Sequence, residues 1–139
     1  MTTKNAVIEM PEPWQITEHF TIEDIRCPCC NMLKIIPAMY RHMEMLEILY
    51  AIIAFEITSG YRCKFHNKAV GGSDGSWHQL FATDIKALEQ VHFEHRSAQK
   101  NAEILAGHAE SVGFKGGIGI YTDGHVHLDT RLKLTRWRG

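Results

Sequence analysis

Hydrophobic positions recur at helical spacing in two long stretches of the chain. After Pro37, the apolar positions of residues 38–50 follow steps of three and four: Met39, Met43, Leu46, and Leu49 or Tyr50. Residues 95–112 carry a second stripe with smaller side chains: Ala98, Ala102, Leu105, Ala109 and Val112. Proline suits the first position of a helix, and Gly113 is a typical helix end. The pattern therefore predicts two amphipathic helices, each with one face in the core.

Shorter stretches have the composition or the alternation of strands. They lie near residues 52–58, 82–86, 117–121 and 125–131. The last two are joined by Asp123-Gly124, a pair that favours a hairpin turn and hence antiparallel pairing. We therefore predict an α+β fold, with a small, mainly antiparallel sheet and helices packed on one side of it.

The two ends of the chain carry weaker patterns. Residues 1–19 are predicted to be an N-terminal lead-in, loose over its first 15 residues because two prolines interrupt it, and residues 20–139 a single domain. The tail from Leu132 to Gly139 carries three basic residues around Trp137. A frayed basic end is the favoured interpretation, although such a tail could also contact an anionic polymer.

Composition and charge narrow the class of protein. The chain has 139 residues, of which 45% are hydrophobic and 22% charged, as is usual for one soluble globular domain. A net charge of −1 gives no electrostatic reason to expect nucleic acid or an anionic membrane as partner. No apolar run is long enough for a transmembrane helix, and the first residues lack the apolar core of a secretory signal. We expect a monomer made in the cytoplasm, which would reach a cell wall only after release.

Two histidines and an aspartate alternate with apolar residues near the end of the chain. His125, His127 and Asp129 are spaced two apart, so the period of a strand places them on one face. Asp129 could orient a ligand histidine through a hydrogen bond. It could equally form a salt bridge with Arg131 or Arg62.

A further histidine and carboxylate lie earlier in the chain. A loop rich in glycine and serine, residues 71–76, leads into His78, and a short predicted strand carries Asp84. Zinc in hydrolytic sites takes three ligands of the His, Asp and Glu types and leaves a position for water. The candidate ligands are His78, Asp84 and His127. Ser76 could bind a ligand or cap the turn, and capping is the favoured interpretation.

The remaining histidines and the cysteines have simpler interpretations. We expect these histidines to be solvated at the surface: His19, His42, His66, His92, His95 and His108. The four cysteines are Cys27, Cys29, Cys30 and Cys63, and in a protein made in the cytosol they are expected to be reduced or metal-bound. A second, structural zinc on Cys27, Cys30 and Cys63 is one interpretation, and buried thiols are the favoured one.

Several ordered blocks of residues resemble a known enzyme family. They are Ser59-Gly60-Tyr61-Arg62, Asn67 to Gly72, Ser76-x-His78, Gly119-x-Tyr121 and His125-x-His127-x-Asp129. Between about Phe20 and Arg131, the chain resembles the zinc D-alanyl-D-alanine carboxypeptidases, a family that includes phage cell-wall lysins and shares its fold with the hedgehog signalling domain. The resemblance implies zinc on His78, Asp84 and His127. It also implies that Arg62 contacts the substrate carbonyl or stabilises its oxyanion.

The chain departs from the family pattern at two points. Members of the family usually carry the motif His-x-x-Gly-x-Ala-x-Asp. The corresponding segment here, from His78 to Asp84, is one residue shorter and would need a rearranged turn. Some members carry an acidic residue three positions before the last histidine, where this chain has Gly124. Asp123 and His125 remain as candidates for the general base, and His125 is favoured.

The candidate ligands predict a metal-dependent hydrolase, and the resemblance implies a zinc peptidase that hydrolyses an amide bond in the stem peptides of bacterial peptidoglycan. A D-Ala-type carboxypeptidase and an endopeptidase such as a phage lysin both fit. The alternative is a catalytically inactive zinc- or cell-wall-binding module, or a phage structural component, with the same fold. The shortened segment between His78 and Asp84 is the feature that favours this alternative.

Overall fold

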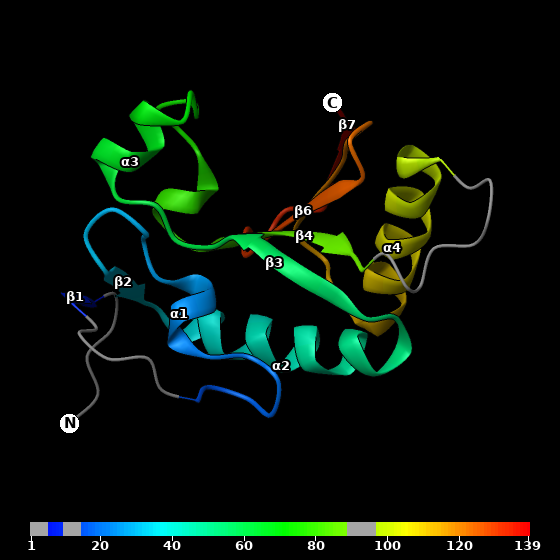
Figure 1. Cartoon of the computed structure of the whole chain (residues 1–139), viewed down its shortest axis with the longest axis horizontal. Coiled ribbons are helices and arrows are strands. Elements are labelled where there is room, and N and C mark those ends of the chain that lie inside the picture. Colours follow the sequence, from blue (N-terminus) through cyan, green and yellow to red (C-terminus); the bar gives the residue numbers. More distant parts are fainter. Residues whose placement is uncertain (1–5, 10–14, 89–96) are drawn as a thin grey trace.

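A five-stranded sheet lies at the centre of the molecule, in a computed structural model that describes residues 6–9, 15–88 and 97–139 (Figure 1). The strand order is β3 (Phe55–Ser59), β4 (Ala82–Ala87), β6 (His125–Asp129), β5 (Gly117–Ile120) and β7 (Thr135–Arg138). Every pairing is antiparallel except that of β5 with β7. The predicted α+β class and mainly antiparallel sheet are confirmed, as is the hairpin that joins β5 to β6.

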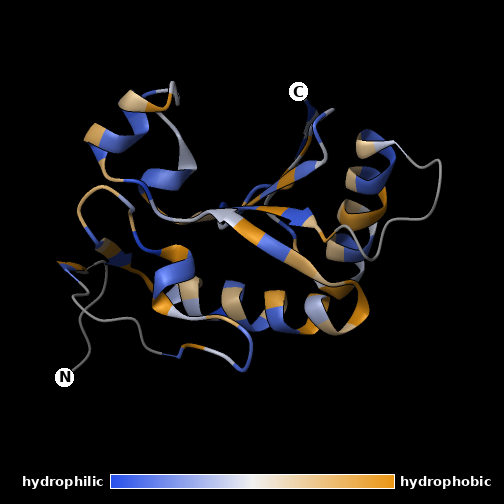
Figure 2. Ribbon diagram, viewed as in Figure 1, coloured by the Kyte–Doolittle hydropathy of each residue, from blue (hydrophilic) through white to orange (hydrophobic). Residues whose placement is uncertain are grey.

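Two long helices, α2 (Pro37–Ile52) and α4 (Ala98–Val112), bury apolar stripes against the sheet. Met39, Met43 and Leu46 of α2 are buried, and strand residues of the same core include Ile85 and Val126. Figure 2 shows hydrophobic and hydrophilic residues alternating along β3, as expected for a strand with one face in the core. No helix in the described part of the chain combines the length and the apolar character that a membrane span requires.

Helix boundaries differ from the sequence prediction by a few residues. Helix α2 continues to Ile52, so β3 begins only at Phe55. Ser97 caps α4 by accepting a hydrogen bond from the backbone N–H of Lys100, and Ala98 is exposed rather than part of the buried stripe. The predicted start of this helix at residues 95 and 96 lies outside the described residues. Gly113 ends α4 in the left-handed conformation, with φ of 116°, as predicted.

Short elements surround the edge of the sheet formed by β3. They are the helices α1 (Ile22–Ile25) and α3 (Lys64–Ala69), the 3₁₀ turn η1 (Trp77–Gln79), and a separate two-stranded sheet. That second sheet pairs β1 (Ala6–Glu9) antiparallel with β2 (Met32–Ile35). The N-terminal lead-in is therefore not loose throughout, because its β-branched residues find a strand partner about 25 residues later in the chain.

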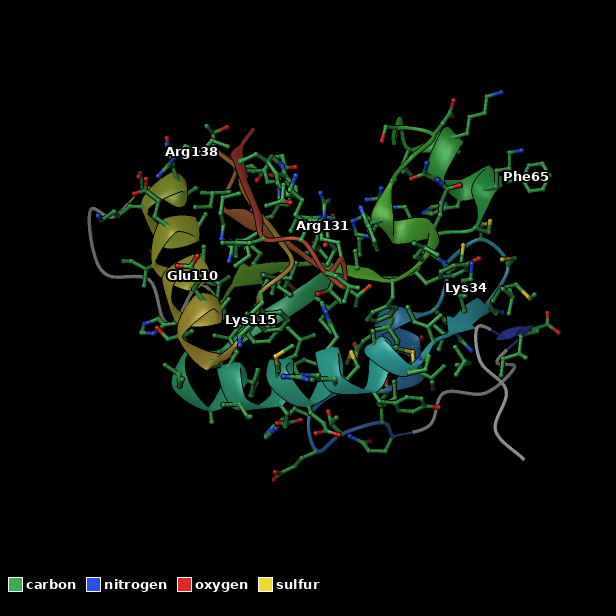
Figure 3. All side chains as sticks on the ribbon, turned by 180° about the vertical axis from the view of Figure 1, so that it is seen from behind. Lys34, Phe65, Glu110, Lys115, Arg131 and Arg138 are labelled. Carbon is green, nitrogen blue, oxygen red and sulfur yellow. The ribbon has the colours of Figure 1, made fainter. Side chains whose placement is uncertain are left out.

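The C-terminal tail is a strand, and the prediction of a frayed end is wrong. Strand β7 extends the sheet beside β5. Two ion pairs join it to α4, one between Arg136 and Glu110 and one between Arg138 and Glu103, each with an N–O distance of 2.7 Å. Figure 3 shows Arg138 beside α4, on which Glu110 also lies. The two arginines of the tail are thus held by acidic side chains of the protein itself.

His42 is buried, which corrects the expectation of a surface histidine. It lies on the apolar stripe of α2, three residues after Met39, and its ring meets Phe81 and Phe114 edge-on. Its Nε2 is 2.9 Å from Oγ1 of Thr83, and its Nδ1 has no hydrogen-bond partner among the described residues. Burial lowers the pKa of His42 to about 3, and the charge of Asp129 offsets this effect only in part.

This buried histidine predicts a loss of stability in acid. Because the folded pKa lies below the ordinary value of 6.5, the unfolded chain binds the extra proton between these two values. Well above pH 6.5, the titration of His42 does not change the free energy of unfolding. Below pH 6.5, this free energy falls as the pH drops. Between pH 7.5 and pH 5.0, urea unfolding should show wild-type protein losing roughly 2 kcal/mol more than the His42→Gln variant. Parallel pH profiles for the two proteins would contradict a neutral, buried His42.

Candidate metal centre

The site lies on the face of the sheet opposite the long helices, in a single row of paired residues. Ser59 of β3 is paired with Asp84 of β4, which is paired with His127 of β6. The row continues through Gly119 of β5 to Trp137 of β7. Strand register therefore brings together residues that are up to 78 positions apart in the sequence. The predicted common face of His127 and Asp129 is confirmed, because their side chains hydrogen-bond each other.

His78 reaches this row from the turn η1. The side chain of Ser76 caps the turn by accepting a hydrogen bond from the backbone N–H of His78, at 3.3 Å. The Nδ1–H of His78 donates to the carbonyl oxygen of Gly60 at 2.7 Å, and the backbone N–H of Arg62 donates to the carbonyl oxygen of His78 at 2.8 Å. These bonds fix the ring and leave Nε2 facing Asp84, 3.3 Å from Oδ2.

The shortened segment between His78 and Asp84 does not separate the two side chains. The 3₁₀ turn ends at Gln79, Phe81 is buried in the core, and β4 begins at Ala82. A tight turn followed directly by the strand thus replaces the longer connection usual in the family. The departure that favoured an inactive module leaves the candidate ligands together.

His127 is held between two carboxylates. Its Nδ1 is 3.2 Å from Oδ1 of Asp84, and its Nε2 is 2.9 Å from Oδ2 of Asp129. Asp129 is itself held by the guanidinium of Arg131, at 2.6 Å, and by the backbone N–H of Gly117, at 2.9 Å. Both roles considered for Asp129 are therefore present, the hydrogen bond to a histidine and an ion pair, the latter with Arg131.

The carboxylates of the site and His127 shift one another's pKa values towards the charged forms. Burial raises the pKa of Asp84, but hydrogen bonds from His127 and His78 lower it by more, to well below its usual range. Burial likewise raises the pKa of Asp129, and contacts with His127 and Arg131 again outweigh it. The pKa of His127 is raised, because the two carboxylates outweigh the effect of burial. Both aspartates are therefore ionised at neutral pH.

The three candidate ligands fit one metal ion. Donor atoms of His78, Asp84 and His127 all lie within 4.8 Å of one another. Nε2 of His78 and Nδ1 of His127 face the two oxygens of the same carboxylate. A divalent cation that replaced the proton on His127 would contact all three groups. Two nitrogens and an oxygen, with each histidine oriented through its other nitrogen, form the donor set of a catalytic zinc site.

Asp123 and His125 form a pair beside the candidate ligands. Oδ1 of Asp123 accepts hydrogen bonds from the backbone N–H and from Nδ1 of His125, at 3.0 and 2.6 Å. The ring of His125 stacks on Tyr121, with centroids 4.0 Å apart, and the hydroxyl of Tyr121 accepts a hydrogen bond from Nε1 of Trp137. His125 lines the same cavity as His78 and His127, whereas Asp123 does not.

A cavity of about 300 Å³ opens above the three ligands. Its lining combines cationic, aromatic and small polar side chains: Arg62, Ser73, Gly75, Ser76, Trp77, His78, Asp84, Tyr121, His125, His127, Arg131 and Trp137. Arg62 extends over Asp84, with Nη2 at 3.4 Å from Oδ2, and its Nε donates to Oγ of Ser59. The volume lies at the lower end of the range usual for ligand sites.

The family model described as peptidase M15 matches residues 18–129, which is most of the chain and includes every candidate ligand. The chain belongs to the peptidase M15 family. No curated protein and no solved structure gives a significant match to it. M15 peptidases are metal-dependent, so the M15 chain is assigned to the metallopeptidases.

Two aromatic residues of the cavity were not expected from the sequence. The guanidinium carbon of Arg131 lies 5.2 Å from the ring centroids of both Trp77 and Trp137 in the M15 chain. Trp137 can cover His127 because Gly119 has no side chain. A Cβ atom at this position would come within 2.5 Å of the indole. The signal in the sequence was the pair of glycines at positions 117 and 119, since small residues on one strand face leave room for a large neighbour.

The contact between Asp129 and His127 leads to a prediction about metal affinity. Asp129→Asn should weaken zinc binding by the M15 chain about 10- to 100-fold, because the carboxylate fixes the ring and increases the basicity of the ligand nitrogen. Competition with a chromophoric chelator measures this affinity. Glu110→Gln, which removes a surface ion-pair partner of Arg136, is the matched control and should leave it unchanged. Equal affinities in the two folded variants would show that Asp129 has no such role.

Proposed function

We propose that this M15 chain hydrolyses amide bonds in the stem peptides of bacterial peptidoglycan, with zinc held by His78, Asp84 and His127. The observation that carries the proposal is the convergence of these three donors beneath a polar cavity, with each histidine held through its second nitrogen. The resemblance to D-alanyl-D-alanine carboxypeptidases supports the choice of substrate class.

Zinc bound by these residues would polarise the substrate carbonyl and lower the pKa of water towards about 7. His125 is the favoured general base, because Asp123 holds its Nδ1 and leaves Nε2 to accept a proton in the cavity. The same nitrogen would return the proton to the departing amine. The alternative, Asp123 acting directly, has less support because that side chain does not line the cavity.

Arg62 and Ser76 are the proposed contacts to substrate. Arg62 would stabilise the developing oxyanion, and its guanidinium is positioned by Ser59 and by the buried Asn67. Asn67 also donates to the carbonyl oxygen of Ser73 at 2.8 Å, which ties α3 to the loop over the cavity. The hydroxyl of Ser76 accepts a hydrogen bond from the turn, and its proton remains available to a substrate carbonyl.

Defined muropeptides test the substrate directly. Zinc-loaded protein should shorten a pentapeptide stem or split a cross-linked dimer, and the product masses tell a carboxypeptidase from an endopeptidase. A chelator should stop the reaction, and added zinc should restore it. Muropeptides left intact by the zinc-loaded protein would contradict the proposal. Intact muropeptides that nevertheless bind the protein would instead favour the inactive cell-wall-binding module.

A further inference from the structure

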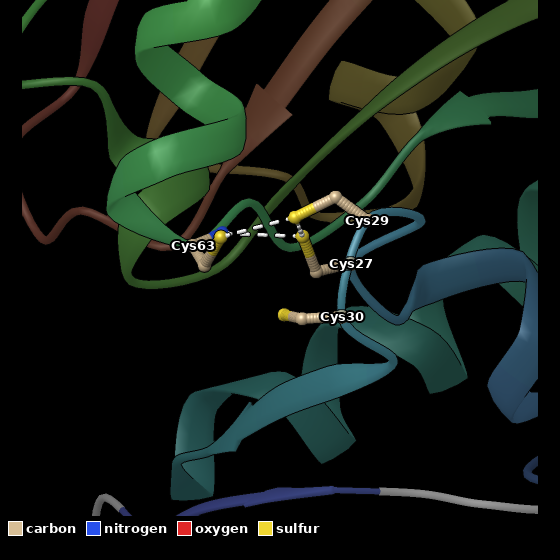
Figure 4. A group of neighbouring side chains, drawn as sticks. All are labelled: Cys27, Cys29, Cys30 and Cys63. Atoms are coloured by element: carbon tan, nitrogen blue, oxygen red, sulfur yellow. Dashed lines mark hydrogen bonds between the residues drawn. The ribbon is translucent and has the colours of Figure 1, made fainter.

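The four cysteines come together in one cluster, away from the candidate catalytic ligands. Cys27, Cys29 and Cys30 lie in the loop between α1 and β2, and Cys63 directly precedes α3 (Figure 4). Their sulfur atoms all lie within 4.8 Å of one another. None of the four forms a disulfide, and only Cys27 is buried, so the favoured interpretation of buried thiols holds for Cys27 alone.

The backbone of the loop turns all its cysteines towards one point. The backbone N–H of Asn31 donates to the carbonyl oxygen of Cys27 at 2.8 Å, and that of Cys27 donates to the carbonyl oxygen of Met32 at 2.7 Å. Asn31 has a φ of 61°, the only left-handed residue other than glycine in the described part of the chain. Asparagine tolerates this conformation better than most residues. The tight turn brings Cys27 and Cys30 within reach of one ion.

Backbone N–H groups also point at the sulfurs. Sγ of Cys27 accepts a hydrogen bond from the N–H of Cys63 at 3.4 Å, and Sγ of Cys63 accepts one from the N–H of His66 at 3.4 Å. A neutral thiol is a weak acceptor, whereas a thiolate is a strong one. These bonds therefore suit sulfur atoms that carry negative charge, which is the form that binds metals.

The sulfur separations match a metal site better than a disulfide. Sγ of Cys29 lies 3.5 Å from that of Cys27 and 3.4 Å from that of Cys63. Four sulfurs about 2.3 Å from a tetrahedral zinc ion would be about 3.8 Å apart, whereas the sulfurs of a disulfide are about 2.05 Å apart. We propose that Cys27, Cys29, Cys30 and Cys63 bind one structural zinc ion, with Cys29 as the fourth ligand.

Four protein ligands leave no position for water, so this zinc would stabilise the fold without taking part in catalysis. It would join the loop of residues 27–30 to Cys63, which directly follows Arg62. The same region is close-packed, because the N–H of Tyr61 donates to the carbonyl oxygen of Ile25 and a Cβ on Gly60 would clash with the backbone of Ile25. The zinc would thereby hold the segment that orients His78 and carries Arg62.

Metal analysis of the full-length protein, purified under reducing conditions, tests this site. Wild-type protein should contain about two zinc ions per chain, and a mercurial reagent that reacts with thiolates should release about one of them. His127→Ala should keep the ion that the mercurial releases. Cys29→Ser and Cys63→Ser should each lose it while keeping the ion bound by the histidines.

Cobalt(II) substitution keeps the test decisive if a cysteine variant fails to fold. Cobalt-loaded His127→Ala should show intense thiolate-to-cobalt charge-transfer absorption. Three results would overturn the proposal: cobalt-loaded protein without that absorption, His127→Ala without any bound metal, or a Cys29–Cys63 disulfide, detected by mass, in a separate sample freshly purified without reductant. Because none of these measurements depends on activity, a failure to hydrolyse muropeptides would leave the outcome for this site unchanged.

Discussion

Replacing His127 by alanine is expected to lower amide hydrolysis about 1,000-fold or more and to remove one zinc ion per chain. His127 lies at the centre of the row, and its two ring nitrogens face the carboxylates of Asp84 and Asp129. Losing it leaves two ligands for the ion and two ionised, buried carboxylates without their shared partner. Because metal activation is worth several kcal/mol of barrier and each 1.4 kcal/mol is a factor of ten, the rate should fall at least this far.

Zinc content and turnover on a muropeptide are measured on the same preparation. His108→Ala is the matched control, since His108 is a partly exposed histidine of α4, the helix that packs against the opposite face of the sheet. The control should keep both the metal and the rate. If His127→Ala retained its full zinc content, the assignment of the ligands would be wrong, whatever happened to the rate.

Replacing His125 by alanine is expected to lower turnover about 100-fold or more while leaving the zinc content unchanged. Its ring lines the cavity, and its Nδ1 is held by Asp123, so Nε2 is placed to accept a proton. Asp123→Asn should have a smaller effect, about tenfold, because that residue orients the base from a position where 64% of its side chain is exposed.

The two variants distinguish the two candidates for the base. A larger loss of turnover in Asp123→Asn than in His125→Ala would make Asp123 the base. Near-normal rates in both would mean that the proton acceptor comes from another part of the chain. Loss of zinc from His125→Ala would show instead that this histidine supports the metal, so metal content must accompany each rate.

Local patterns in the sequence located much of the fold and, together with the family resemblance, suggested the three candidate ligands. Helical spacing located α2 and α4, and the Asp123-Gly124 turn located the hairpin of β5 and β6. The alternation of His125, His127 and Asp129 placed them on one face, because the two-residue period of a strand depends only on neighbouring residues. The same stripe could have identified His42 as buried, since it falls on the apolar face of α2.

Only the tertiary structure decided which distant segments meet. The sequence of β7 reads as a basic tail, because its strand partner β5 is distant in the sequence. In the fold, β5 pairs with it and Gly119 leaves room for Trp137. Cys29 joins the other three sulfurs through a left-handed turn at Asn31 and the packing of Gly60 on Ile25. Pairing of this kind depends on register and shape complementarity between segments far apart in the sequence. Local composition determines the elements and their buried faces, and the packed fold determines the neighbours of each side chain.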